Sequence, residues 1–419
     1  MRLAERIDHA NAEVARRLTA SRARWVDVRP LRDVVLDLGA YELTHSGPPL
    51  LWREMGGAQR GAVIAAVLFE GWASTPSEAR GMLDRAEVTL RPNHHAGGVG
   101  ASTGVGSPTA PVCVLEERGV SDRQGAQSWA LLELPGANPG AHDAESIAGR
   151  RRWRDGFTPA LAKALSAAGG VDVDAVVARA LHMGDEMVHR TGAATALTVA
   201  ALAPALARAG LGGAELAAGL DALLEGEGFF GALALAAAKL ACDGVKSVDD
   251  STVVTAMSRN GARCGVRLAG TGDKWFTATA PTVKGLLLDG YDEDDAGRDL
   301  GDSAIAETAG LGAFVLAGAP ALHARLGTRS ADGLRVTRDM GEVTVARHPR
   351  YTLPALEFAG APVGIDARRV VDTGILPVIG ATIVHREPGR GAIGAGLARV
   401  PMGCFTAAIE QFAEDRGIR

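Results

Sequence analysis

The sequence predicts an α/β protein with several domains, in which α/β regions flank a helical middle domain. The chain has 419 residues, which is too long for one ordinary hydrophobic core. Strand-like apolar segments lie near both ends of the chain. Between about 158 and 246, Ala- and Leu-rich segments show helical periodicity and end at glycines. We therefore expect domains at 1–150, 151–248 and 249–419.

The N-terminal region combines helix and strand signals. Residues 1–20 are amphipathic and predict a helix, whereas 32–38 resemble a strand and 62–71 a short apolar helix or strand. Glycines interrupt the segment 91–111, where we expect no helix. The apolar segment 111–115 predicts a buried strand.

The middle and C-terminal regions differ in periodicity. Two middle segments, 193–207 and 231–241, are apolar on all sides and are expected to be buried. After residue 250, strand signals return at 251–257, 264–270, 334–338 and 341–348.

Composition excludes several classes of protein. The net charge of -5 argues against a nucleic-acid partner, which needs a concentrated basic face. The four cysteines are scattered, which argues against a disulfide framework or a structural zinc site. The N-terminus lacks the apolar core of a signal peptide, and no apolar stretch is long enough to span a membrane. We expect a cytoplasmic protein with no cofactor and no metal.

Two glycine-rich strings in the first region carry candidate residues. Arg60 follows a His-Ser-Gly-Pro-Pro string and is suited to bind phosphate or carboxylate, and the simpler alternative is a loop with a solvated arginine. His94 and His95 precede Gly97 and Gly98 in a loop whose N–H groups are suited to bind an anion. The alternative is a flexible surface loop.

The middle region contains the string His-x-x-Asp-Glu-x-x-His, from His182 to His189. On a helix, its polar side chains would share one face and form a metal site or a proton-transfer site, with Glu186 orienting a histidine. Arg190, directly after it, is a candidate anion ligand. A hydrogen-bonded patch between helices is the simpler alternative.

Three strings in the last region add candidates. Arg259 and Asn260 stand before a glycine at a predicted strand end, a common place for binding residues. Asp302 lies between a glycine and an apolar helix. His385 precedes a glycine-rich turn that includes Gly391, suited to an anionic group, but too little chain follows for a dinucleotide fold. Ordinary turn chemistry is the alternative for each.

Taken together, these strings resemble one bacterial family, whose assigned member is a subunit of oxamate carbamoyltransferase in allantoin degradation. The strings that carry the resemblance lie in family order between residues 45 and 396, and they are HSGPPLLWREMGGAQRGA, ALHMGDEMVHR, STVVTAMSRNG, DKWFTA, DGYDEDDAGRDLGDSAIAETAGLG, PVGIDARRVV and VHREPGRGAIGAG. The chain differs from the family pattern at the polar positions 93–96, 188–191 and 379–381.

The resemblance implies carbamoyl transfer between an amide or amine nitrogen and phosphate. Anions would be bound by Arg60, Arg190 and Arg259, and a proton would move through His94, His95 or His385, oriented by Glu186 or Asp302. We expect these strings to converge on one pocket between the three regions, which holds a small ligand with a carboxylate or phosphate group. A companion subunit or a second copy of the chain is an expected partner.

Two other hypotheses remain open. The changed polar positions favour a non-catalytic partner subunit of a transferase complex. The string from His182 to His189 favours a metal-dependent amide hydrolase.

Overall fold

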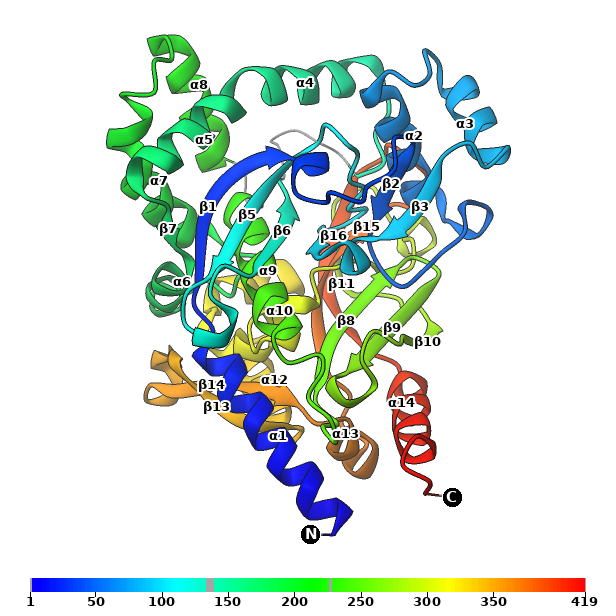
Figure 1. Cartoon of the computed structure of the whole chain (residues 1–419), viewed down its shortest axis with the longest axis vertical. Coiled ribbons are helices and arrows are strands. Elements are labelled where there is room, and N and C mark those ends of the chain that lie inside the picture. Colours follow the sequence, from blue (N-terminus) through cyan, green and yellow to red (C-terminus); the bar gives the residue numbers. More distant parts are fainter. Residues whose placement is uncertain (1, 133–138, 226–227, 419) are drawn as a thin grey trace.

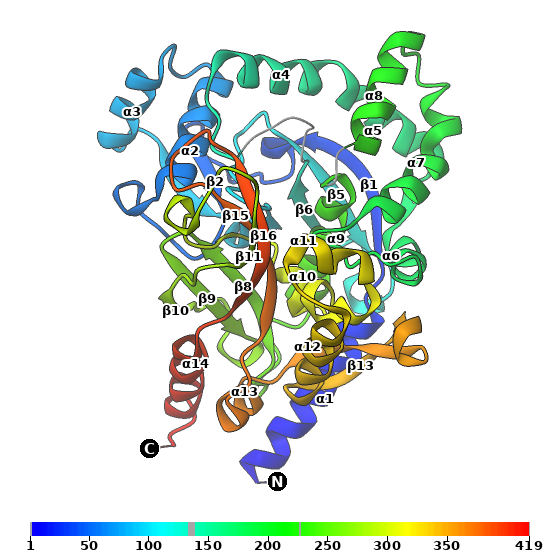
Figure 2. The ribbon, with the colours of Figure 1, turned by 180° about the vertical axis from the view of Figure 1, so that it is seen from behind.

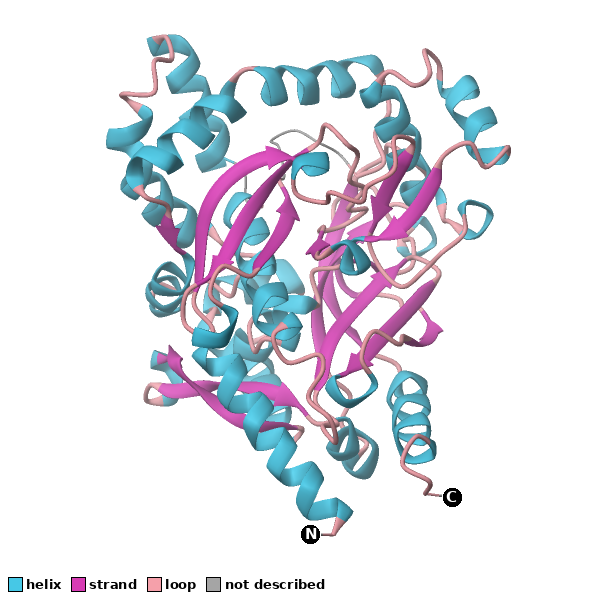
Figure 3. Cartoon of the chain, in the orientation of Figure 1, coloured by secondary structure: helices cyan, strands magenta, loops and turns pink. Residues whose placement is uncertain are grey.

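A computed structural model describes residues 2–132, 139–225 and 228–418 of the chain. Most of the strands lie in the interior, and helices surround them (Figure 3). The first and the last helix, α1 and α14, lie at the same end of the molecule, whereas α4 crosses the opposite end (Figure 1). The mixture of helices and strands confirms the α/β class at the level of secondary structure.

Five sheets are built largely from antiparallel strands. The first sheet has the order β4-β6-β5-β1-β7, and the second has the order β10-β9-β8-β12. A third sheet, β11-β16-β15, lies beside the second when the molecule is seen from behind (Figure 2). The pairs β13-β14 and β2-β3 complete the set, and β2 and β3 are parallel. The strand bounds are β1 Ala23–Pro30, β2 Glu42–His45, β3 Thr89–Pro92, β4 Gly98–Val99, β5 Pro111–Glu117, β6 Gln127–Leu131, β7 Val171–Asp172, β8 Val254–Asn260, β9 Arg263–Leu268, β10 Phe276–Thr279, β11 Lys284–Leu287, β12 Leu300–Gly301, β13 Thr344–Leu353, β14 Ala359–Ile365, β15 Val378–Val384 and β16 Ala392–Arg399.

The helices are short to medium in length, and several end at a glycine in the left-handed conformation, which glycine adopts without steric cost. Their bounds are α1 Leu3–Ala20, α2 Gly57–Glu70, α3 Pro76–Asp84, α4 Ala144–Asp155, α5 Phe157–Ala168, α6 Val173–His182, α7 Gly192–Leu206, α8 Gly213–Glu225, α9 Phe229–Asp243, α10 Ile305–Thr308, α11 His323–Leu326, α12 Ser330–Glu342, α13 Ala367–Thr373 and α14 Met402–Glu414. Within the described ranges, no helix is long and apolar enough to cross a membrane.

Several predicted elements are confirmed. The amphipathic N-terminus forms α1, which buries Ile7, Val14 and Leu18 on one face. The segment 62–71 belongs to helix α2, and 111–115 belongs to the buried strand β5. In the described part of 158–246 the regular elements are helices joined by loops, with the two-residue strand β7 as an exception because it pairs with β1.

Two strand predictions were wrong. In 32–38, the backbone N–H groups of Val34 and Val35 both donate to the carbonyl oxygen of Leu31, so the chain turns instead of extending. In 334–338, the chain lies inside α12, whose buried Val336 and Met340 are one helical turn apart. Apolar residues at such spacing suit either element over a short window, and here tertiary packing selects the helix.

Two further expectations need correction. The glycine-rich segment 91–111 contains a 3-10 turn at Asn93–Ala96. The apolar segment 231–241 is buried in α9, but α7 exposes one face, which includes Ala200 and Ala201. Exposed alanines cost little because each presents only a small apolar area to water.

The largest hydrophobic core joins distant parts of the chain. Helix α9 packs against β5 and β6, and its Phe230 and Leu233 belong to the same cluster as Val14 from α1 and Val363 from β14. All three sequence regions therefore contribute to one core. The division into three domains stays a prediction.

Candidate functional site

Strand β8 places polar side chains on both of its faces. Because side chains alternate along a strand, Ser258 and Asn260 point to one side and Arg259 to the other. Ser258 donates to the Asp302 carboxylate, and the Asn260 amide donates to the carbonyl oxygen of Pro48 at 2.9 Å. Arg259 binds the segment just before Asp302. The strand therefore anchors the 46–48 loop and the 299–303 segment together.

Arg259 is almost fully buried and engaged by protein acceptors. Its guanidinium forms a two-pronged contact with the Asp299 carboxylate, at 2.8 and 3.0 Å, and donates to the carbonyl oxygen of Gly301 at 2.8 Å. A further contact reaches the Ser303 hydroxyl. Through these contacts Arg259 stabilises the 299–303 segment against β8. Binding of a ligand anion by Arg259 stays a prediction.

Asp302 is the centre of a buried hydrogen-bond network. Its carboxylate accepts from the backbone N–H groups of Gly47 at 2.8 Å and Gly100 at 2.9 Å, and from the Asn93 amide at 2.9 Å. The Ser258 hydroxyl is the fourth donor. Burial raises the pKa of Asp302, and these four donors act in the opposite direction because they favour the ionised form.

His94 lies beside Asp302 in a cationic environment. Its Nε2 is 3.6 Å from the Asp302 carboxylate, and the Lys239 ammonium donates to its carbonyl oxygen at 3.3 Å. Burial, together with the charges of Lys239 and Arg267, holds the pKa of His94 well below its usual range, so the ring is neutral. Within the described residues, neither ring nitrogen has a hydrogen-bond partner.

His95 lies at the exposed edge of the same cluster. The Trp275 indole N–H donates to His95 Nε2 at 3.1 Å, and the Arg267 guanidinium lies 4.4 Å from the centre of the Trp275 ring. Because the indole nitrogen only donates, Nε2 is unprotonated and a neutral ring carries its proton on Nδ1. Partial burial and the charge of Arg267 lower the pKa of His95 to about 4.

The surroundings of His94 contain hydrogen-bond donors that have no acceptor among the described residues. Arg267 is buried and donates one bond, from Nη1 to Asp273 at 3.1 Å. Its Nε and Nη2 have no hydrogen-bond partner in the part of the chain that the structure describes. Buried donors without partners are costly, and a bound anion would satisfy them. We refer to His94, His95, Lys239, Arg267 and Asp302 as the His94 cluster.

The sequence predicted that the polar side chains from His182 to His189 share one face of a helix, and this prediction was wrong. Helix α6 ends at His182, because Gly184 adopts a left-handed conformation and turns the chain. The Glu186 carboxylate is fully buried and accepts from the backbone N–H groups of the next loop, including that of Arg190 at 2.8 Å. Burial raises the pKa of Glu186 to about 7. In the described ranges, no group of three or more His, Cys, Asp or Glu side chains is placed to hold a metal ion.

Arg190 is tied to the same turn. Its guanidinium lies 3.2 Å from the Asp185 carboxylate and donates to the carbonyl oxygen of Met183 at 3.1 Å. It is half-buried. Like Glu186, Arg190 therefore stabilises the loop between α6 and α7.

A second buried carboxyl group, Glu307, lies close to this loop. One oxygen accepts from the backbone N–H groups of Gly380 at 2.8 Å and Ala313 at 3.0 Å. Its other oxygen, and Nε2 of the buried His189, have no hydrogen-bond partner among the described residues. Burial raises the pKa of Glu307 to about 8, and the Glu186 carboxyl adds to the rise.

The remaining predicted residues make their contacts elsewhere. His385 lies 3.5 Å from the Asp295 carboxylate, and its backbone N–H donates to the carbonyl oxygen of Gly391. Arg60 is exposed and donates to the carbonyl oxygen of Arg53. Gly97 ends the 3-10 turn that holds His94, and a Cβ at Gly98 would overlap the Trp129 ring. These two glycines shape the loop. Convergence of His385 on the same pocket as His94 stays a prediction.

Sequence reasoning gave no role to Lys239 or Arg267. Lys239 lies in the apolar helix α9, where a charged residue among alanines and leucines was the available signal. Arg267 lies next to a strand end, near the Asp-Lys-Trp-Phe string. Both cations lie near His94 only because the fold brings these distant segments together.

Comparison with known proteins places the chain among bacterial relatives. Residues 88–303 match the family model described as oxamate carbamoyltransferase subunit AllG. The chain is 38% identical to the oxamate carbamoyltransferase subunit AllG of Escherichia coli, over 98% of this chain and 99% of that protein. It is 36% identical to the uncharacterized protein YahG of the same organism, over 99% of this chain and 88% of that protein.

A solved structure has the same fold. The crystal structure of a conserved protein of unknown function from Enterococcus faecalis V583 superposes with a TM-score of 0.96. The two chains are 35% identical, and the alignment covers 99% of each.

Proposed function

Because the chain belongs to the AllG family of oxamate carbamoyltransferase subunits, we propose that it works as one subunit of an enzyme that moves a carbamoyl group between an amide or amine nitrogen and phosphate. The observation that supports a site in this chain is the His94 cluster. It combines two buried cations with neutral imidazoles, and two guanidinium nitrogens of Arg267 are unpaired within the described chain. His94 lies 3.6 Å from the Asp302 carboxylate, whereas Lys239 pairs with Asp243 and Arg267 with Asp273.

The chemistry of the transfer fits these groups. In the direction from carbamoyl phosphate, the acceptor nitrogen attacks the carbonyl carbon, an N–C bond forms, the bond from carbon to the phosphate oxygen breaks, and the nitrogen loses a proton. Cations and N–H donors stabilise the negative charge that develops on the leaving phosphate. A neutral imidazole is able to accept the proton.

Each member of the cluster then has a role. Arg267 would hold the phosphate, because two of its guanidinium nitrogens are unpaired within the described chain. Lys239, whose ammonium pairs with the Asp243 carboxylate at 2.6 Å, would add positive charge nearby. His94 would take the proton, because both of its ring nitrogens are unpaired within the described chain and its Nε2 lies 3.6 Å from the Asp302 carboxylate. His95 is a weaker candidate, because its Nε2 already accepts from the Trp275 indole. His385 is a weaker candidate because its ring interacts with Asp295 and with the N–H of Glu387.

The test is an activity measurement on the full chain assembled with its companion subunits. Phosphate release from carbamoyl phosphate is followed in the presence of oxamate. We expect Arg267→Gln to lower kcat/KM by about tenfold or more, because a charged hydrogen bond to the phosphate is lost. Arg263→Gln is the matched control, since Arg263 lies on the same strand but is exposed.

The same assay separates the second hypothesis, a non-catalytic partner subunit. The differences from the family pattern at the polar positions 93–96, 188–191 and 379–381 favour that hypothesis. If Arg267→Gln and His94→Asn both keep full activity in folded, assembled enzyme, the chemistry lies in another subunit.

A further inference from the structure

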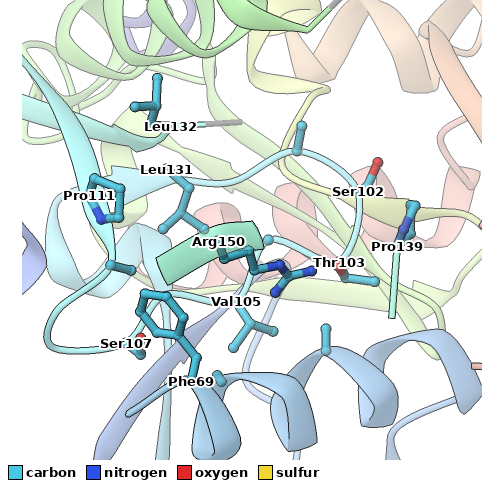
Figure 4. A pocket seen from close by; sticks show the side chains of 15 residues that line it. Phe69, Ser102, Thr103, Val105, Ser107, Pro111, Leu131, Leu132, Pro139 and Arg150 are labelled. Atoms are coloured by element: carbon cyan, nitrogen blue, oxygen red, sulfur yellow. The ribbon is translucent and has the colours of Figure 1, made fainter. Parts of the chain in front are cut away.

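Access to the His94 cluster lies on the side of His95. The other members of the cluster are buried, whereas His95 is exposed. A separate cavity of about 200 Å³ lies between α2, residues 101–105 and Arg150 (Figure 4), and no described residue that lines it belongs to the cluster. A ligand from solvent therefore meets His95 first, so the contacts that hold His95 decide what it offers to that ligand.

Trp275 joins three members of the cluster. Its indole N–H donates to His95 Nε2 at 3.1 Å, and the guanidinium carbon of Arg267 lies 4.4 Å from the centre of its ring. The His94 ring meets the indole edge to face, with ring centres 5.4 Å apart and planes at 83°. Trp275 is half-buried and connects the exposed His95 with the buried Arg267. One side chain therefore contacts both imidazoles and the cation whose donors are unpaired.

Packing against β9 leaves the indole little freedom. A Cβ at Gly265 would lie 2.9 Å from Cε3 of Trp275 and 2.7 Å from Cγ of Pro48, so the two rings occupy the space beside this glycine. Directly after Trp275, the buried Phe276 begins β10 and pairs with Val266 of β9. These contacts set the direction of the indole N–H.

The hydrogen bond from Trp275 fixes the proton of His95. An indole nitrogen only donates, so Nε2 of His95 has to accept, and a neutral ring carries its proton on Nδ1. Partial burial and the charge of Arg267 lower the pKa of His95 to about 4, which keeps the ring neutral near pH 7. His95 therefore offers a hydrogen-bond donor at Nδ1 without carrying a charge.

The contact with Trp275 stabilises Arg267 without replacing an acceptor. An aromatic face attracts a cation through its quadrupole, but it does not satisfy N–H groups as an oxygen acceptor would. Nη1 of Arg267 donates to the Asp273 carboxylate at 3.1 Å, whereas Nε and Nη2 have no hydrogen-bond partner among the described residues. Two donors of the cation therefore remain for a ligand.

Trp52 makes the same two kinds of contact outside the cluster. Its indole N–H donates to the Asp84 carboxylate at 2.7 Å, and the Arg60 guanidinium lies 5.4 Å from the centre of its ring. Like Trp275, Trp52 is half-buried, but a carboxylate has no tautomer to select. Substitution of Trp52 therefore removes an equivalent indole and serves as the matched control.

We propose that Trp275 is a positioning residue for anion binding, which makes His95 a neutral donor at Nδ1 so that His95 and Arg267 bind one phosphate group. The inference rests on the proposed function and deepens it, because it assigns His95 to the phosphate and not to the proton. A free imidazole exchanges between its two tautomers, and the indole removes that exchange. Donors that are fixed before the ligand arrives stabilise an oxyanion without reorganisation during the reaction.

The first measurement is the tautomer of His95, by nitrogen NMR of the full chain with isotope-labelled histidine. Protonated and unprotonated imidazole nitrogens have distinct shifts, and His95→Ala identifies the signals of this ring. We expect the unsubstituted chain to carry the proton on Nδ1. Trp275→Phe keeps an aromatic ring beside Arg267 but loses the indole N–H, so it should shift the signals toward the other tautomer. Trp52→Phe should leave them unchanged.

The second measurement is binding of inorganic phosphate to the full chain by calorimetry. Trp275→Phe and His95→Ala should each weaken binding by about tenfold, the effect of losing one hydrogen bond to a charged group. The double variant should bind about as weakly as His95→Ala alone, because the indole N–H acts through His95. Trp52→Phe should bind as the unsubstituted chain does. His95→Ala removes an exposed ring, so its effect on phosphate binding tests the proposal even where Trp275→Phe is unstable by circular dichroism.

The proposal is overturned by unchanged His95 signals in Trp275→Phe, by unweakened phosphate binding in His95→Ala, or by no phosphate binding of the unsubstituted chain up to about 10 mM. Fully additive losses in the double variant also overturn it, since Trp275 would then act without His95. Failure of the proposed function has another signature: the assembled enzyme shows no carbamoyl transfer, although phosphate binding by the chain still depends on Trp275 and His95.

Discussion

Asp302 and Glu307 are buried carboxyl groups on one short segment, and their surroundings differ. Asp302 accepts four hydrogen bonds on its two oxygens. Glu307 accepts two, both on one oxygen, and has the Glu186 carboxyl nearby. Four donors stabilise an ionised group, whereas two donors and a like charge favour a protonated one. Two carboxyl groups that are equally buried therefore differ in how many donors oppose the rise in pKa that burial causes.

Among the substitutions that compare the surroundings of Asp302 and Glu307, truncation of Asp302 should change the free energy of unfolding most. Asp302→Ala leaves the N–H groups of Gly47 and Gly100, the Asn93 amide and the Ser258 hydroxyl without their acceptor. We expect the free energy of unfolding to fall by about 3–5 kcal/mol, the range for breaking a buried charged network. Urea denaturation followed by circular dichroism measures it.

The control is Asp289→Ala, which removes an exposed carboxylate and should change stability by less than about 0.5 kcal/mol. Similar losses for both variants would mean that the four donors find other partners. In that case the network around Asp302 would not determine the geometry of the His94 cluster.

The Asp302 centre also shows what the sequence was able to predict. Asp302, Arg259 and Asn260 were identified from polar residues beside glycines, and contacts through β8 join them. The two cations of the His94 cluster were not predicted, because Lys239 and Arg267 come close to His94 from distant elements. Glu186 was identified with a wrong geometry, since the left-handed turn at Gly184 outweighs the helical spacing of the string around it.

The charge state of Glu307 should appear in the pH dependence of stability. Folding raises the pKa of Glu307 from 4.5 to about 8, so the folded chain holds a proton that the unfolded chain has lost. Unfolding releases this proton between those values, and the free energy of unfolding therefore falls as pH rises. The buried His189, whose pKa is lowered to about 4, has the opposite effect, but only below its usual value of 6.5.

The informative window is therefore pH 6.5 to 8. There we expect Glu307→Gln to reduce the fall in stability by about 1 kcal/mol per pH unit, measured by urea denaturation at several pH values. A residual slope from Glu186 should remain, because its pKa is raised to about 7. Glu342→Gln removes an exposed carboxylate and should keep the original slope. An unchanged slope in Glu307→Gln would mean that Glu307 is already ionised across this window.

The smallest expected effect comes from closing the space around Glu307. A Cβ at Gly380 would lie 3.1 Å from the His189 ring, which would have to shift slightly, and 3.5 Å from the Glu307 carboxyl, which is an ordinary van der Waals contact. We expect Gly380→Ala to lower the free energy of unfolding by about 1 kcal/mol, at the low end for overpacking. Gly192→Ala is the control, because no atom lies within 4 Å of its added Cβ and Gly192 is the first residue of α7. That variant should be neutral or slightly more stable, since it only reduces the freedom of the unfolded chain. Equal stability of the two variants would show that the Glu307 centre tolerates movement, and tight packing would then be a property of the Asp302 centre alone.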